Sequence, residues 1–529
     1  MKSVLQKLIE KPIFLFLAFN IIIGLIVHRD FGLTWDEPYF YDYADALGYA
    51  YSPTEWLSDD FNLYNSYGSS REDHKTHGPA YILIARNFAY GFMALGSDEA
   101  SAWHLVNFLF FQLGIYFLYR LSRRWLSSSA AFFATIFFSF QPLIWGHAFI
   151  NPKDPPFLTF FLATLCLGFE MVDSLEVTTK KSTKKIVIAA VTLGIASSIR
   201  VLAPLAGLLV FLYFLFGTGL VKRTSAWRSF ISYGIISIIV MFTTWPFLWE
   251  NPARNFFDMF ILMSSYPTKM AVLFGEVVYS AQELPRRYLP ILMSINLTEP
   301  TWPLFGMGVF FAYWKLIKER GQNFRKQVLS LSLILIWPLV VFGYVILNKP
   351  VLYDGMRHFL FILPPIFIFI GFAFELAREK LSQTRIPSPI LSTLMGLTLI
   401  LPGIIGIVKL HPYQYTYYNS FIGGTDGAFR KYETDFWLTC YKEAAQEINK
   451  MVSPPEKVFV YREAYIAATY FDDSVEVIDL RDEYVKKSPG DYILVSSRTN
   501  EDMTVLSGYS VVMRIKRGNA VFCAVGRVE

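Results

Sequence analysis

The sequence is poor in charge and in cysteine. Only 17% of its 529 residues are charged, and the net charge is +5. The basic residues lie between apolar runs, which is typical of loops that set membrane topology, so no nucleic-acid partner is expected. The three cysteines form no Cys-x-x-Cys pair and no His/Cys cluster of metal-ligand spacing, which argues against a structural zinc site. Whether Cys440 and Cys523 pair with each other stays open.

Apolar residues, in contrast, are abundant. Hydrophobic side chains make up 53% of the sequence and aromatic ones 17%. This balance is typical of an α-helical polytopic membrane protein and not of a soluble domain. No small-residue cleavage site follows the first apolar run, so we expect an uncleaved first helix.

Apolar runs of roughly 20 residues, the length that spans a bilayer, recur along the chain. The twelve candidate runs cover residues 12–28, 79–96, 101–120, 129–149, 155–173, 186–200, 201–220, 229–249, 301–317, 327–347, 358–376 and 388–410. Short cytoplasmic loops carry an excess of Lys and Arg. With a cytoplasmic N-terminus, five basic loops meet this rule only if the run 79–96 is a short juxtamembrane or re-entrant helix. We therefore predict about eleven transmembrane helices plus interfacial helices.

This topology places most polar motifs on the external face. Residues 1–410 form the predicted membrane module, and residues 29–100 form its first external loop with juxtamembrane helices. Residues 411–529 alternate strand-like runs such as KVFVYR and DYILVSS with helical segments, which predicts a small extracytoplasmic α/β domain. The expected location is the inner (plasma) membrane, with this C-terminal domain outside.

Two acidic motifs lie at the ends of apolar runs. Asp36 and Glu37, in TWDEPYF, follow the first run directly. A carboxylate at an apolar boundary is partly desolvated, which raises its pKa and makes it a better proton acceptor; the alternative is a solvated loop beside an aromatic belt. Asp154, in INPKDPPFL, could cap the helix that follows, but capping does not explain the neighbouring Lys153.

Basic and aromatic residues gather on the same predicted face. The stretch LYDGMRHFL contains Tyr353, Arg357 and His358. Further candidates for contact with a phosphate are Lys75, His77 and Arg200. Arg suits a phosphate in a poorly hydrated place because its fork donates two hydrogen bonds, although any one of these residues could be an interfacial anchor. Together with the acids they indicate a lipid-phosphate substrate, whose tail the apolar walls admit.

The order of these motifs resembles a known family. TWDEPYF, HGPAYILIA, INPKDPPFL, ASSIRVLAP, WPFLWENP and LYDGMRHFLFILPP follow one another as in bacterial members of the protein O-mannosyltransferase superfamily, glycosyltransferase family 39, which is close to the aminoarabinose transferases. The similarity covers nearly the whole chain. The usual HPPL or KPP element reads HGPA here, so Lys75 and His77 match the phosphate-contacting position only loosely. The sugar-recognising repeats of the eukaryotic members are missing, which puts a protein acceptor in doubt.

The resemblance implies a GT-C fold with an external active site. It implies an inverting glycosyltransferase that moves a hexosyl or pentosyl group from a polyprenyl-phosphate donor to an acceptor lipid, glycan or protein of the cell envelope. It also implies Asp36 as the general base with Glu37 beside it, and Asp154 as a second acid that organises the site. Arg357 and His358 would then meet the donor phosphate.

Other readings of the same residues stay open. A transporter or flippase of a lipid-linked saccharide would use these cations without breaking a bond, although ionisable residues are scarce at mid-span. A receptor that binds through its C-terminal domain is favoured if Asp36 and Asp154 lie far apart. No cofactor is certain: the acids could hold a divalent cation, or the basic residues could neutralise the phosphate alone.

Overall fold

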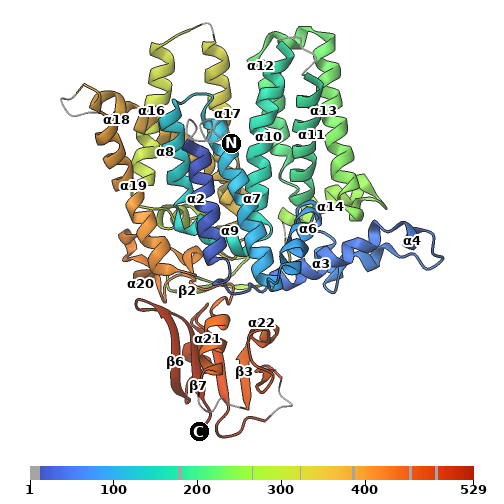
Figure 1. Cartoon of the computed structure of the whole chain (residues 1–529), viewed down its shortest axis with the longest axis vertical. Helices are drawn as coiled ribbons and strands as arrows, with labels where there is room; N and C mark the ends of the chain where they lie inside the picture. The colour runs from blue at the N-terminus through green and yellow to red at the C-terminus, as the bar shows by residue number, and fades with distance from the viewer. Residues whose placement is uncertain are drawn as a thin grey trace.

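The computed structural model describes residues 12–176, 182–264, 266–321, 323–383, 388–451, 456–482 and 486–529. Residues 1–11, expected in the cytoplasm, lie outside this part of the chain. A bundle of helices forms most of the molecule, and a smaller sheet lies beyond one end of it (Figure 1). The hairpins α12–α13 and α16–α17 close the opposite end.

Each of the twelve apolar runs coincides with helical structure. The corresponding helices are α2 (Pro12–Val27), α6 (Ala80–Ala94), α7 (Glu99–Ser122), α8 (Ser128–Ser139), α9 (Pro142–Ile150), α10 (Asp154–Glu176), α11 (Ser182–Ile199), α12 (Pro204–Gly217), α13 (Thr224–Thr243), α16 (Thr301–Lys318), α17 (Phe324–Asn348), α18 (Pro364–Leu381) and α19 (Ser388–Leu410). Packing of apolar faces stabilises them: Phe161 of α10 stacks on Trp337 of α17 with ring centroids 4.6 Å apart.

Fewer helices than the predicted eleven have the full length of a membrane span. Within the described residues, α7, α10, α13, α17 and α19 are long and apolar enough to cross a membrane, and the bent pair α8–α9 raises the number to six. Other apolar helices are shorter, since α2 has 16 residues and α12 has 14. The protein is nevertheless a multi-pass membrane protein, because several of its helices meet the requirement independently.

Proline determines several helix ends. The run 129–149, predicted as one candidate span, is interrupted where Pro142 follows Gln141, and its two halves meet at an angle of 66°. Proline lacks the backbone N–H that a continuous helix requires, but it is well tolerated in the first turn. For the same reason α10 begins with Pro155 and Pro156 after Asp154, next to the site described below.

The run 79–96 forms α6, which has 15 residues and is not one of the helices long enough to cross a membrane. It packs against α7 and against α3 (Glu37–Ala50), at the end of the bundle that faces the sheet (Figure 1). The helix α14 (Pro252–Ser264) lies at the same end, and α3 leads sideways to α4 (Pro53–Trp56). This arrangement fits the predicted juxtamembrane helices of the first external loop.

Short elements complete the connections. They are η1 (Leu63–Tyr67), α5 (Arg71–His74), η2 (Gly219–Lys222), η3 (Pro246–Leu248), the antiparallel pair β1 (Ala271–Phe274) and β2 (Val277–Ser280), α15 (Tyr288–Ile295), η4 (Arg357–Ile362), η5 (Gln414–Thr416), η6 (Ser420–Ile422) and α20 (Gly424–Ala428). The segment after α19 packs into the bundle before the sheet begins: Asn419 Nδ2 donates hydrogen bonds to the carbonyl oxygens of Ser294 and Leu297 at 2.8 and 2.9 Å.

The C-terminal sheet has five strands in the order β4-β3-β5-β7-β6. Its elements are α21 (Cys440–Asn449), β3 (Lys457–Tyr461), α22 (Ala464–Ala468), β4 (Glu476–Asp479), β5 (Tyr492–Ser496), α23 (Glu501–Val505), β6 (Ser510–Arg517) and β7 (Ala520–Arg527). β3 is parallel to β4 and β5, whereas β7 is antiparallel to β5 and β6. A disulfide between Cys440 and Cys523 joins α21 to β7 and answers the question that the sequence left open.

Candidate active site

Asp36 lies where the loop after α2 turns into α3. Its Oδ2 accepts a hydrogen bond from Arg357 Nη1 at 3.2 Å, and its side chain is 33% exposed. Burial raises the pKa of Asp36 from 3.8 to about 6, while the positive charge of Arg357 acts in the opposite direction. Asp36 is therefore a carboxylate of raised pKa that solvent can still reach, as a general base near neutral pH requires.

Glu37 is held by a different set of partners. It is fully buried, and its Oε2 accepts the backbone N–H of Thr34 at 2.8 Å. Its Oε1 accepts the hydroxyl of Tyr41 at 2.7 Å and lies 3.0 Å from Nε2 of His104 on α7. Oε1 thus joins the start of α3 to α7, and Oε2 fixes the turn before α3, so Glu37 supports its neighbour Asp36 through the backbone.

Asn151, and not Asp154, accepts backbone N–H groups at the start of α10 with its side chain. The side-chain oxygen of Asn151 accepts the backbone N–H groups of Lys153 and Asp154 at 3.0 and 2.9 Å, and its amide donates to Asp154 Oδ2 at 2.8 Å. The other oxygen of Asp154 is ion-paired with Nη2 of Arg200, in the turn between α11 and α12. Asp154 therefore holds an arginine, and the alternative that it only caps α10 is disfavoured.

Lys153 carries an ammonium group without a hydrogen-bond or ion-pair partner in the described part of the chain. The group lies 5.8 Å from the centre of the Phe40 ring, and the ring of His77 stacks on the same phenyl group at a centroid distance of 5.8 Å. Burial and then the charge of Arg200 lower the pKa of Lys153. Burial and then the charge of Lys153 lower the pKa of His77, so this imidazole is neutral.

Arg357 lies between two aromatic rings at the start of η4. Its guanidinium carbon is 5.4 Å from the ring centre of Tyr353 and 5.1 Å from that of Trp437. Its Nε is buried without a hydrogen-bond partner. His358 packs edge-on against Tyr353 at 5.1 Å, and burial followed by the charge of Arg357 lowers the pKa of His358. Arg357 and His358 thus offer one charged and one neutral donor side by side.

The acidic and basic side chains described above form one cluster. Asp36 is subject to the charges of both Arg357 and Lys153, and Asp154 interacts with the same two cations. The two acids thus flank a common set of cations, which disfavours the receptor reading that depended on their separation. Lys153, Arg200 and Arg357 supply the positive charge of this cluster.

Lys75 does not join this cluster. Its Nζ donates to Glu72 Oε2 at 2.7 Å, and the side chain of Glu72 is 72% exposed. The following loop instead brings His77 inward, because Gly78 crosses the end of α11. A Cβ at Gly78 would lie 1.7 Å from the carbonyl oxygen of Ser198, so only glycine fits there. This contact explains the glycine of HGPA. Ser198 lies two residues before Arg200, which belongs to the facing turn.

Sequence reasoning missed a buried charge network that reaches this cluster from the sheet. Arg498, in the loop after β5, donates from Nη2 to Asp354 Oδ1 at 2.9 Å and from Nε to Glu433 Oε1 at 3.1 Å. Asp354 Oδ2 in turn lies 2.8 Å from Arg357 Nη2. Burial raises the pKa of Glu433 to about 7, against the charge of Arg498. The stretch SSRTN around Arg498 carries no motif that could have indicated these contacts.

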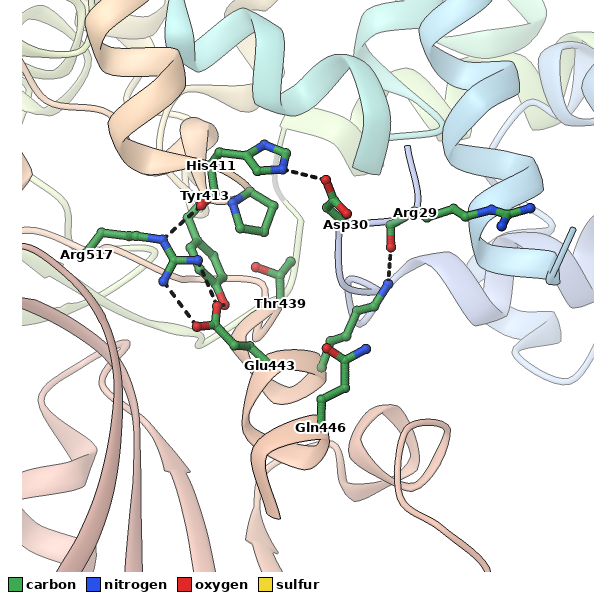
Figure 2. Close-up of a pocket in the computed structure, with 10 residues that line it drawn as sticks. Arg29, Asp30, His411, Tyr413, Thr439, Glu443, Gln446 and Arg517 are labelled. Carbon is green, nitrogen blue, oxygen red and sulfur yellow. Dashed lines mark hydrogen bonds and ion pairs between the residues drawn. The ribbon is translucent and has the colours of Figure 1, made fainter. Parts of the chain in front are cut away.

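A separate polar pocket of about 290 Å³ lies where the bundle meets the sheet (Figure 2). None of the predicted site residues lines it. Its charged groups pair with one another: His411 Nε2 lies 2.8 Å from Asp30 Oδ2, and Arg517 Nη2 lies 2.8 Å from Glu443 Oε2. Arg517 Nε also donates to the carbonyl oxygen of His411 at 2.8 Å, which ties β6 to the end of α19, and Lys442 Nζ donates to the carbonyl oxygen of Phe31 at 3.0 Å, which ties α21 to the loop after α2.

Within the described residues, one group of side chains has metal-ligand spacing, namely Asp435, Cys440 and Cys523. The two cysteines are joined in the disulfide, so they offer no thiolate to a metal. The divalent cation considered from the sequence therefore has no candidate ligands at this position. Asp36 and Asp154 are each already paired with an arginine.

A comparison with protein families gives a match over part of the chain. The profile of the dolichyl-phosphate-mannose-protein mannosyltransferase family matches residues 78–249, a range that includes Lys153, Asp154 and Arg200. No curated protein matches the sequence.

Solved structures show the fold. The archaeal oligosaccharyltransferase AglB from Archaeoglobus fulgidus, in complex with an inhibitory peptide and a dolichol-phosphate, aligns with a TM-score of 0.51 at 11% identity, over 96% of this chain and 74% of that chain. The apo form of the Archaeoglobus fulgidus oligosaccharyltransferase gives a TM-score of 0.52 at 12% identity, over 91% and 69%. Arabinofuranosyltransferase AftD from Mycobacteria is more distant, with a TM-score of 0.44 at 12% identity, over 97% and 40%.

The chain is thus a multi-pass membrane protein with the GT-C fold and a small C-terminal sheet, as predicted. The resemblance to the protein O-mannosyltransferase superfamily is confirmed as well, by the family match at residues 78–249. The bacterial origin and the roles of the individual site residues stay predictions.

Proposed function

We propose that this protein is an integral-membrane glycosyltransferase. It moves one sugar from a polyprenyl-phosphate carrier to an acceptor hydroxyl on the extracytoplasmic face, with inversion at the anomeric carbon. The observation that carries the proposal is the contact between the half-buried carboxylate of Asp36 and Arg357, beside the ammonium of Lys153, which has no partner among the described residues. A base next to several phosphate-binding cations is what this transfer requires.

In the proposed step, Asp36 takes the proton of the acceptor hydroxyl. The acceptor oxygen forms a bond to the anomeric carbon while the bond from that carbon to the phosphate oxygen breaks. The electron pair of the broken bond leaves with the polyprenyl phosphate. Since the bond formed and the bond broken lie on opposite faces of the sugar, a single displacement inverts the anomeric centre. Catalysis then consists mainly of positioning and of stabilising the charge on the leaving phosphate.

The cations of the cluster receive that charge. Lys153 is the best candidate for direct contact, because its ammonium has no acceptor in the described part of the chain. Arg200 and Arg357 are each fixed by a carboxylate, so their remaining N–H groups can point at the phosphate without further loss of side-chain freedom. His77 and His358, both neutral, can donate hydrogen bonds to phosphate oxygens.

The proposed orientation puts the cluster and the sheet outside the cytoplasm, with the N-terminus inside. The Cys440–Cys523 disulfide supports this side, because disulfides persist in oxidising compartments. We further propose that residues 1–410 form the catalytic module and residues 411–529 a C-terminal domain, in the inner (plasma) membrane. The AglB structure contains a dolichol-phosphate and a peptide, which supports a lipid-linked donor and leaves acceptor lipids, glycans and proteins as the candidates here.

The test uses the purified full chain in lipid nanodiscs with a radiolabelled polyprenyl-phosphate sugar. Release of polyprenyl phosphate that depends on an added acceptor supports a transferase. Movement of the intact donor across a vesicle bilayer, with no release, would instead indicate a flippase. A parallel assay with a chelator, followed by addition of single metals, determines whether a divalent cation assists the leaving phosphate or the basic residues suffice.

A further inference from the structure

Arg498 is an arginine of the C-terminal sheet that lies inside the boundary of the membrane module. Its side chain is 1% exposed. Besides Asp354 and Glu433, it donates from Nη1 to the carbonyl oxygen of Phe436 at 3.2 Å, and its guanidinium carbon lies 4.3 Å from the ring centre of Trp35. Trp35 directly precedes Asp36 in the chain. Arg498 therefore contacts two residues linked to the proposed base, Asp36. One is Trp35, which precedes Asp36 in the chain, and the other is Asp354, which pairs with the same arginine, Arg357.

Asp354 is the link between the two arginines. It is fully buried, and one carboxylate oxygen lies 2.9 Å from Arg498 while the other lies 2.8 Å from Arg357. Its backbone has a φ of 56°, in the left-handed region that aspartate tolerates better than most residues. If the carboxylate of Asp354 moved with one arginine, it would lose its contact with the other. The position of Arg357 therefore depends on Arg498.

We propose that Arg498 is a positioning residue of the active site, which holds Arg357 through Asp354 and the backbone of Asp36 through Trp35. The inference rests on the proposed glycosyl transfer. It makes the C-terminal sheet a component of the catalytic centre, and not an appended binding domain.

Electrostatics gives the reason. Along the row Asp36, Arg357, Asp354, Arg498 and Glu433, negative and positive groups alternate, and each buried charge has an opposite neighbour. Removal of Arg498 would leave Asp354 with one counter-ion, Arg357, and would draw that guanidinium away from Asp36. A buried charge without its partner is strongly unfavourable, so the remaining pair tightens.

A second contact from the same sheet fixes the backbone at Asp36. The hydroxyl of Tyr465, on α22, donates to the carbonyl oxygen of Trp35 at 2.8 Å, and its ring lies 5.5 Å from that of Tyr39. The guanidinium group of Arg498 packs on the indole ring of Trp35, as a cation over an aromatic face. The residues on both sides of Asp36 are thereby attached to elements that follow residue 460.

The experiment compares Arg498→Gln and Arg498→Lys with Arg517→Gln, in the full chain. Arg517 pairs with Glu443 within the C-terminal region and, although its side chain is 23% exposed, is the control for loss of an ion-paired arginine outside the cluster. For Arg498→Gln we expect kcat to fall on the order of 100-fold, the effect of misplacing reacting groups by about 1 Å, with little change in the KM for the donor. Arg498→Lys retains the charge and should recover part of the loss.

The pH profile separates positioning from a merely structural role. The charged groups that act on Asp36 are Arg357, Asp354, Lys153 and Asp73. When Arg357 is drawn toward Asp354, Asp36 loses the cation that lowers its pKa, so the acid limb of kcat should move to higher pH in Arg498→Gln. The control Arg517→Gln should keep the wild-type profile.

Wild-type kcat and an unmoved acid limb in folded Arg498→Gln would overturn the inference. If that variant does not fold, Arg498→Lys and Glu433→Gln decide in its place: the inference requires a lower kcat and a shifted limb in both, and fails if both behave as wild type. Absence of transfer by the wild-type protein would instead refute the proposed function itself, so the two failures are distinguishable.

Discussion

The raised pKa of Asp36 gives the sharpest quantitative prediction. A general base must be deprotonated, so transfer should decline as the pH falls through its pKa. With a pKa of about 6, roughly 90% of Asp36 is ionised at pH 7 and roughly 10% at pH 5. The rate should therefore fall about tenfold between these values, whereas an aspartate of ordinary pKa, 3.8, would lose almost nothing over the same range.

Substitution of the base tests the same point by a second route. In Asp36→Asn, the amide oxygen can still accept the hydrogen bond from Arg357, but the group can no longer take a proton. Loss of a general base lowers the rate by about 10²- to 10⁴-fold, and we expect kcat to fall in this range. Asp30→Asn, in the same loop, removes a carboxylate that pairs with His411 outside the cluster and serves as the control.

The assay is the release of radiolabelled sugar from its polyprenyl-phosphate carrier, measured between pH 4.5 and 8.5 in nanodiscs. Thermal unfolding of each variant shows that the fold is retained. A rate that stays flat from pH 7 to pH 5, or an Asp36→Asn protein within tenfold of the wild type, would remove Asp36 from the role of base. The same losses in Asp30→Asn would attribute the effect to the loop.

Three further predictions follow from single contacts. Lys153→Met should raise the KM for the donor about 10- to 100-fold, which is the contribution of a hydrogen bond to a charged group. The control Lys75→Gln should leave this KM unchanged, and initial rates at varied donor concentration measure both. Gly78→Ala should lower the free energy of unfolding by about 1 to 3 kcal/mol, because the new methyl group meets the backbone of α11. Thermal unfolding in detergent measures this change, and Gly91→Ala, whose methyl group would meet no atom within 4 Å, is the control. Replacement of Cys440 by Ser should cost about 2 to 4 kcal/mol and match the effect of reductant on the wild type, and equal stability of the two forms would contradict a structural role for the disulfide.

The helices could be predicted because hydropathy alone determines them. Every apolar run became helical, but the bend between α8 and α9 did not follow from hydropathy, although Pro142 marked it. The strand β7 was not among the strand-like runs that the sequence indicated. AVFCAVGR is buried almost throughout, so it lacks the alternation of polar and apolar residues by which a half-exposed strand is recognised.

The site could be predicted in part. Asp36, Asp154 and Lys153 stand at the ends of apolar runs, where a charge has few structural reasons to lie, and the structure brings them to the same cations. Contacts between distant segments gave no local signal. Asp36 and Arg357 are 321 residues apart, and Arg498 lies a further 144 residues from Asp354. The capping of α10 by Asn151 was also hidden, because Asp154 is an equally good capping residue by type.

The ion-pair row that begins at Asp36 and ends at Glu433 has a consequence for how the protein is made. The ribosome delivers Asp36 in the loop after α2, but Arg498 emerges only after all the helices of the bundle. With Arg498 in the proposed positioning role, a nascent chain whose bundle is already inserted in the membrane stays inactive until its C-terminal sheet has folded against the bundle. Copies that stop before Arg498 would then be inert helices, and catalytic competence would mark a chain whose C-terminal sheet is in place.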